Sequence, residues 1–129
     1  MAEFSALPGQ TFSKVELARD WDVTGNDAIL FYQDGILKYA LTHTQDCCES
    51  VYLSDIEGEL SSLENTVILF ADESSNSYSN DDCESGTWSF YKLNTRKGWV
   101  DMRFNGQSNG YYSETVYLHD IDSEGRITW

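Results

Sequence analysis

Two eight-residue segments of this 129-residue chain are nearly identical, and this repeat constrains the fold more than any other feature. Residues 49–56 (ESVYLSDI) and 114–121 (ETVYLHDI) agree at six of eight positions. Upstream of each copy, Phe31-Tyr32 and Phe90-Tyr91 belong to strands that turn back into another strand. We therefore predict two copies of a strand–turn–strand–loop–strand unit. The copies should pack together or share one sheet, because neither can bury its apolar face alone.

The remaining pattern is that of a β protein. Aromatic residues make up 14% of the chain, and they favour strands. Asp34-Gly35 separates two apolar runs and is typical of a tight hairpin turn. The helix candidate is residues 57–63, which Gly58 weakens. The predicted strands are residues 12–18, 28–33, 36–42, 48–53, 66–71, 87–93, 99–104 and 114–118. We predict a mainly β fold, α+β at most, with an antiparallel sheet built from two similar units and one short helix.

The length fits a single domain over residues 1–129, which can bury about two thirds of its unfolded surface. We expect residues 1–10 to be flexible. Residues 74–86, rich in Ser, Asn, Asp and Glu, should form an exposed acidic loop. No apolar run reaches the length that spans a membrane, and residues 1–10 lack the pattern of a signal peptide. A cytoplasmic location, in a bacterial host cell, is the resulting expectation.

Three cysteines, an odd number, argue against a disulfide framework. Cys47 and Cys48 are adjacent, and neighbouring side chains of a strand point to opposite faces. We therefore expect reduced thiols. Cys83 lies between two acidic residues, which make it a poor nucleophile.

The charge is strongly negative: 22 acidic residues face eight basic ones, a net charge of −14. No basic residue occurs between Lys38 and Lys92. Such a surface repels nucleic acid, whose binding needs Lys and Arg to displace counterions from phosphates. The charge either keeps the protein soluble or steers it toward a basic partner, even into a groove meant for nucleic acid. The predicted partner-binding residues are Asp72, Glu73, Asp81, Asp82 and Glu84.

The residues richest in possible chemistry lie between two predicted strands. Imidazole, thiolate and carboxylate groups are the ligands that zinc takes, usually four in a tetrahedron. The candidate metal ligands are His43, Asp46, Cys47, Cys48 and Glu49. The spacing is not that of a zinc finger, and the second copy has no comparable residues. A structural zinc ion is one interpretation; a cysteine packed as a small apolar side chain beside a polar turn is the other.

Enzyme motifs are missing from the sequence. There is no nucleophile elbow, no phosphate-binding glycine loop and no zinc-protease helix. His119 precedes an acidic residue, but strand neighbours point apart, so a catalytic pair is not expected there. Residues 105–112 join two glycine turns to a tyrosine pair, and they suit either a binding tip or a plain hairpin turn.

Several of these segments resemble a family of small domains common in phage genomes and prophages. The resemblance covers about residues 11–121, and its most specific part is Asp46-Cys47-Cys48-Glu49-Ser50-Val51, preceded by His43. The chain is also similar to small acidic phage proteins that act as anti-CRISPR inhibitors, some of them against Cas9. That resemblance implies a Cas9 inhibitor with a structural zinc. Cys83 and its surroundings depart from the shared pattern, so no role carries over to them.

The leading hypothesis is a phage-derived, non-enzymatic inhibitor that binds a basic surface of Cas9 and blocks the loading or cleavage of target DNA. Cas9 holds its nucleic acids in basic channels, which suits an acidic ligand. The second hypothesis is a virion accessory or assembly protein that recognises another phage protein. The third hypothesis is a metal-dependent hydrolase, whose metal ion would need an open coordination position.

Overall fold

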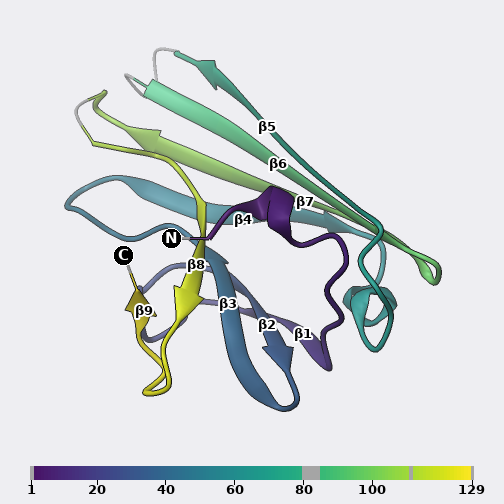
Figure 1. Cartoon of the computed structure of the whole chain (residues 1–129). Coiled ribbons are helices and arrows are strands. Elements are labelled where there is room, and N and C mark those ends of the chain that lie inside the picture. Colours follow the sequence, from purple (N-terminus) through teal and green to yellow (C-terminus); the bar gives the residue numbers. More distant parts are fainter. Residues whose placement is uncertain (1, 80–84, 111, 129) are drawn as a thin grey trace.

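The computed structural model describes residues 2–79, 85–110 and 112–128, which form two antiparallel sheets in two layers (Figure 1). The five-stranded sheet has the strand order β1-β2-β3-β8-β9, and the four-stranded sheet has the order β4-β7-β6-β5. The strands are β1 (Lys14–Ala18), β2 (Ala28–Gln33), β3 (Ile36–Thr42), β4 (Ser50–Glu57), β5 (Phe70–Tyr78), β6 (Ser85–Thr95), β7 (Gly98–Ser108), β8 (Tyr117–Ile121) and β9 (Ile127–Thr128). The mainly β prediction is confirmed. No helix in the described part of the chain is long and apolar enough to cross a membrane.

The two sequence copies exchange their last strands. In the first copy, the hairpin of β2 and β3 lies in the five-stranded sheet, but β4 crosses over and pairs with β7. In the second copy, the hairpin of β6 and β7 lies in the four-stranded sheet, and β8 crosses back to pair with β3. Each repeated octapeptide therefore completes the sheet of the other copy. Each sheet therefore contains strands from both copies.

The registers of the two sheets match up to Leu53 of β4, beyond which a register shift between Leu53 and Asp55 has no counterpart in β8. Across the five-stranded sheet, one row of paired residues runs from β8 to β1, and the corresponding row of the other sheet runs from β4 to β5. The rows are Leu118–Leu41–Ile29–Leu17 and Leu53–Phe104–Ser89–Ser75. Leu53 and Leu118 occupy the same position of the repeat. Phe31 thus corresponds to Tyr91, so the sequence alignment of Phe31 with Phe90 is off by one residue.

The tight turn between β2 and β3 forms as its sequence indicates. Asp34 and Gly35 both have positive φ, 53° and 77°, as a two-residue hairpin turn requires. The bounds of β2 and β3 accordingly agree with the predicted strands.

The main core lies between the sheets and includes the N-terminal segment. Phe4, in the 3-10 turn η1 (Phe4–Ala6), and the nearby Leu7 are buried. The Ala2 amide donates a hydrogen bond of 3.0 Å to the Leu118 carbonyl. In Figure 1 this purple segment runs along the open side of the two layers. Within the segment expected to be flexible, Phe4 and Leu7 thus contribute to the core.

Three further predictions need correction. The expected loop at 74–86 is partly strand: Ser74–Tyr78 belongs to β5 and Ser85–Gly86 to β6, while residues 80–84 lie outside the described residues. The strand predicted at 66–71 starts only at Phe70, because pairing with β6 decides its position. The helix predicted at 57–63 is a 3-10 turn, η2 (Leu60–Leu63).

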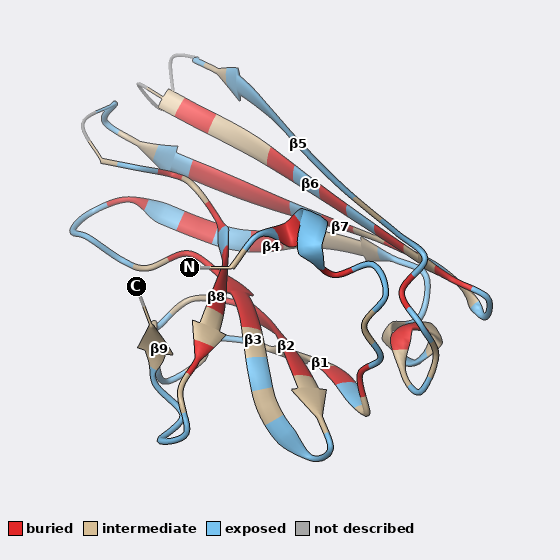
Figure 2. Cartoon of the chain, viewed as in Figure 1, coloured by how far each residue is buried: buried red, intermediate tan, exposed pale blue. Residues whose placement is uncertain are grey.

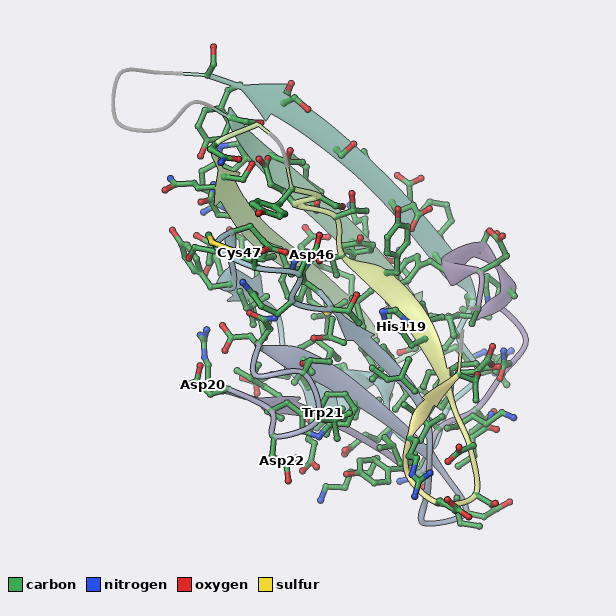
Figure 3. All side chains as sticks on the ribbon, turned by 90° about the vertical axis from the view of Figure 1, so that its left-hand side faces the viewer. Asp20, Trp21, Asp22, Asp46, Cys47 and His119 are labelled. Carbon is green, nitrogen blue, oxygen red and sulfur yellow. A yellow bond between two sulfur atoms is a disulfide. The ribbon has the colours of Figure 1, made fainter. Side chains whose placement is uncertain are left out.

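The outer faces of the two sheets differ in how they are covered. A smaller apolar cluster lies on the five-stranded sheet, where Trp21 of the β1–β2 loop and Ile127 of β9 pack over Ala28, Leu30 and Ala40. Figure 3 shows Trp21 on this loop, well away from the four-stranded sheet. No described segment lies over the outer face of the four-stranded sheet in Figure 1. That face is therefore the larger open surface.

Candidate functional site

The turn between β3 and β4 is built around a buried, hydrogen-bonded pair of side chains, His43 and Glu49. The side chains are 3% and 0% exposed, and His43 Nε2 lies 2.8 Å from Glu49 Oε2. His43 Nδ1 lies 2.7 Å from the Thr115 carbonyl oxygen. Oxygen atoms of Glu49 and Thr115 therefore face both ring nitrogens of His43. The pair joins the turn to the strand that arrives from the other copy.

Glu49 also organises the backbone of its own turn. Its Oε2 accepts a hydrogen bond from the Asp46 amide (2.9 Å) and its Oε1 one from the Cys47 amide (2.8 Å). Burial favours the neutral acid and raises the pKa of Glu49, but the Cys47 amide, His43 and the Asp46 amide outweigh it and lower the pKa to about 2. Glu49 is therefore a carboxylate at neutral pH, with a structural role.

The zinc ligands proposed from the sequence do not converge here. Both nitrogens of His43 and both oxygens of Glu49 already have hydrogen-bond partners. Asp46 and Cys47 lie on the exposed turn, away from His119 (Figure 3). The described residues hold no group of three His, Cys, Asp or Glu side chains arranged for a metal ion. Zinc binding would require rearrangement of this turn, and it stays a prediction.

Cys47 and Cys48 are joined by a disulfide, with their Cα atoms 3.7 Å apart. The expectation of reduced thiols is wrong for this pair. It assumed that the strand had already begun, whereas both residues lie in the turn before Ser50, the first residue of β4. Strand alternation therefore does not separate their side chains. Cys83 lies outside the described residues.

The second copy uses the equivalent position differently. Gly106 stands where the register places His43, and a Cβ atom there would come within 2.8 Å of the Glu114 Cβ. Glu114, the counterpart of Glu49, is also buried, and it accepts hydrogen bonds from the hydroxyls of Thr87 (2.7 Å) and Ser108. A buried glutamate therefore anchors each crossing strand, once through an imidazole and once through hydroxyl groups.

The outer face of the four-stranded sheet combines aromatic rings with carboxylates. Strand pairing aligns its outward side chains in rows across β5, β6, β7 and β4. The three central rows are Asn76–Trp88–Asn105–Tyr52, Ser74–Phe90–Arg103–Asp55 and Asp72–Lys92–Asp101–Glu57. Tyr52, Phe90 and Trp99 are each more than a third exposed. Exposed aromatic residues are enriched where proteins bind one another.

Two basic side chains of this face already contact its aromatic rings. The Arg103 guanidinium lies 5.2 Å from the centre of the Trp88 ring and 3.9 Å from the Asp55 carboxylate. The Lys92 ammonium lies 5.9 Å from the centre of the Trp99 ring. The two distances to ring centres, 5.2 Å for Arg103 and 5.9 Å for Lys92, fit a cation–π contact. Ring faces and carboxylates are therefore placed so that one cation can contact both.

A hollow of about 310 Å³ opens on the outer face, beside Phe90. Four carboxylates and two basic side chains line it, which leaves a local charge of −2 (2 − 4). These charged residues are Asp55, Glu57, Asp72, Asp101, Lys92 and Arg103. The face can therefore accept further positive charge.

The partner-binding residues expected from the sequence do not share one surface. Asp72 and Glu73 are neighbours in β5, so they point to opposite sides of the sheet. Asp72 lies on the outer face, whereas Glu73 pairs with Tyr91 on the inner side. Figure 2 shows β5 exposed along almost its whole length. Asp81, Asp82 and Glu84 lie outside the described residues.

Sequence reasoning missed the residues that make the outer face distinctive, namely Trp88, Phe90 and Arg103. Their signal was present, since alternate residues 88, 90 and 92 of one predicted strand must share a face. The alignment with Arg103 required the register, which depends on the long β6–β7 hairpin.

Fold and surface define a β-sandwich of exchanged repeats with an open acidic and aromatic sheet face. Residues 5–118 match the model of a domain of unknown function, DUF7448. The chain therefore belongs to the DUF7448 family. No curated protein and no solved structure matches the chain.

Proposed function

We propose that this protein is a binding domain, not an enzyme, and that the outer face of the four-stranded sheet binds a cationic protein surface. The observation that carries the proposal is the position of Arg103, between the Trp88 ring and the Asp55 carboxylate. Lysine and arginine side chains of a partner would contact groups of the same two kinds, aromatic rings and carboxylates, on this face. Charge complementarity of this kind increases association rates and excludes anionic partners.

The specific partner we propose is the CRISPR effector Cas9, with the protein acting as a phage-derived inhibitor. This step depends on the resemblance described above, and the net charge of −14 is consistent with it. An acidic sheet face that binds a basic nucleic-acid channel would compete with DNA for the same lysines and arginines.

Two triple variants with equal charge test which surface binds. Asp55→Asn, Glu57→Gln and Asp101→Asn neutralise the outer face. The control variant carries Asp22→Asn, Asp34→Asn and Glu124→Gln, three exposed acids on loops of the other sheet. Both variants change the net charge from −14 to −11, so total charge does not distinguish them.

The assay is capture of purified Cas9–guide RNA complex at about 50 mM salt, followed by target cleavage. We expect the face variant to lose about tenfold or more in affinity and inhibition, and the control variant to behave like the parent protein. Equal losses would show that only net charge matters. Undetectable Cas9 binding by the parent protein would refute Cas9 as the partner, and detection of the protein in purified phage particles would favour the virion hypothesis.

A further inference from the structure

A second hollow, the polar hollow, lies on the inner side of the four-stranded sheet. Its volume is about 230 Å³, and β5, β6 and the segment that enters β8 line it. The residues that line it include Glu73, Ser75, Ser89, Tyr91, Thr115 and Tyr117. Inner faces of a β-sandwich normally supply apolar side chains to the core. Here, on and beside the edge strand β5, a carboxylate and several hydroxyl-bearing residues stand in their place.

The five-stranded sheet provides an internal reference for this place. Three inner positions that are apolar in one sheet are polar at the corresponding positions of the other. The matched pairs are Val15 and Glu73, Leu17 and Ser75, and Ile29 and Ser89. Val15 and Ile29 are buried in the core. The same scaffold thus closes its inner face in one sheet and leaves a polar recess in the other.

The recess is negatively charged. Glu73 is exposed in it, and none of its lining residues is basic. The Glu73 carboxylate is also close enough to influence Tyr91: burial raises the pKa of Tyr91, and the negative charge of Glu73 raises it further. An anionic ligand would be repelled here, whereas a cation would gain a counter-ion.

The remaining lining groups select for the shape of that cation. Ser75, Ser89 and Thr115 line the recess, and Tyr117, which lines it too, exposes 42% of its surface. A guanidinium group presents five donors in one plane, binds carboxylates through two parallel hydrogen bonds and stacks on aromatic rings. An ammonium group is a compact charge whose three donors do not lie in one plane, so it forms neither the paired hydrogen bonds nor the stacking contact.

We propose that the polar hollow binds the guanidinium group of an arginine side chain, with Glu73 as its counter-ion and Tyr117 as its stacking surface. The inference deepens the proposed function, because this arginine would belong to the cationic partner. The outer face and the polar hollow lie on opposite sides of β5. The partner would therefore reach around this edge strand, whose side chains are exposed on both sides.

The test uses Nα-acetyl-argininamide as the probe, titrated into the ¹⁵N-labelled full chain and followed by NMR. Nα-acetyl-citrullinamide, a neutral isostere, is the ligand control. Glu73→Gln removes the proposed counter-ion, and Asp72→Asn is the matched control with the same charge change one residue away on the opposite face. Both residues are exposed, so neither substitution threatens the fold.

We expect saturable shifts around Ser75, Ser89 and Tyr117 with the arginine probe and none with citrulline. Glu73→Gln should weaken binding by about tenfold or more, whereas Asp72→Asn should change it less than about twofold. Shifts centred on Trp88 and Asp55, or equal effects of both variants, would overturn the arginine site. Those results would leave the outer-face proposal intact, because that proposal is tested by the triple variants and Cas9.

Discussion

The two sheets are built on matching registers, yet one inner face is sealed and the other is partly polar. Leu17 and Ile29 continue the apolar row of the five-stranded sheet, while Ser75 and Ser89 end that row in the four-stranded sheet. The outer faces differ in the same sense, since the first sheet is covered by Trp21 and Ile127 and the second is open. We infer that the first sheet mainly stabilises the fold, whereas the second presents the binding surfaces.

The largest expected difference concerns one matched pair of core positions. Ile29→Ser should destabilise the protein by about 3–5 kcal/mol, because it removes a fully buried side chain and buries a hydroxyl. Ser89→Ala, at the corresponding position, should cost less than about 1 kcal/mol. Urea denaturation measures both free energies of unfolding.

Ile29→Val serves as a milder control, with an expected cost of about 1 kcal/mol. If Ser89→Ala proves as costly as Ile29→Ser, the polar row is part of the core and the contrast between the sheets disappears.

The second comparison concerns the two buried glutamates. Glu49→Gln should cost about 3 kcal/mol at pH 7, because it leaves His43 without its charged partner. Glu114→Gln should cost about 1 kcal/mol, since its partners are neutral hydroxyls. Thermal and urea unfolding of the two variants provide the measurement.

The acid dependence of stability sharpens this comparison. The pKa of Glu49 is lowered from 4.5 to about 2 in the folded protein. A lowered pKa stabilises the fold fully above the unfolded value and progressively less below it. The parent protein should therefore lose about 3 kcal/mol between pH 4.5 and pH 2 through this group, and Glu49→Gln should lose correspondingly less. Parallel profiles for both proteins would contradict this role of Glu49 in the turn.

The smallest expected effect on stability comes from making the second sheet resemble the first. Ser75→Leu places the residue of the matching position, Leu17, on an exposed strand. The free energy of unfolding should change by no more than about 0.5 kcal/mol, while binding of the arginine probe should be lost because the hollow is filled. Retained probe binding in this variant would place the ligand elsewhere.

The sequence was most informative where local chemistry decides the structure. Asp34-Gly35 specified the β2–β3 hairpin, and the alternating apolar residues around it specified both strands. The repeated octapeptide correctly indicated two related units. Their exchange between sheets was not predictable, because an isolated copy of β4 or β8 has the same pattern whichever hairpin it joins.

The candidate sites were harder to predict than the fold. β5 has few apolar residues, and its serine-rich segment looked like a loop because its strand form depends on pairing with β6. The sequence singled out His43 and Glu49 as candidate metal ligands, whereas their mutual hydrogen bond depends on the path of the turn. The correspondence between Glu73 and Val15 can be recognised only when the registers of both sheets are known.

Carbodiimide cross-linking between the protein and its captured cationic partner tests the central claim most directly. The reagent joins carboxylates to lysines in contact, and mass spectrometry identifies which carboxylates react. We predict cross-links from Asp55, Glu57, Asp72, Glu73 and Asp101, all on or beside the four-stranded sheet. Cross-links confined to Asp22, Asp34 and Glu124, on the loops of the other sheet, would contradict this assignment.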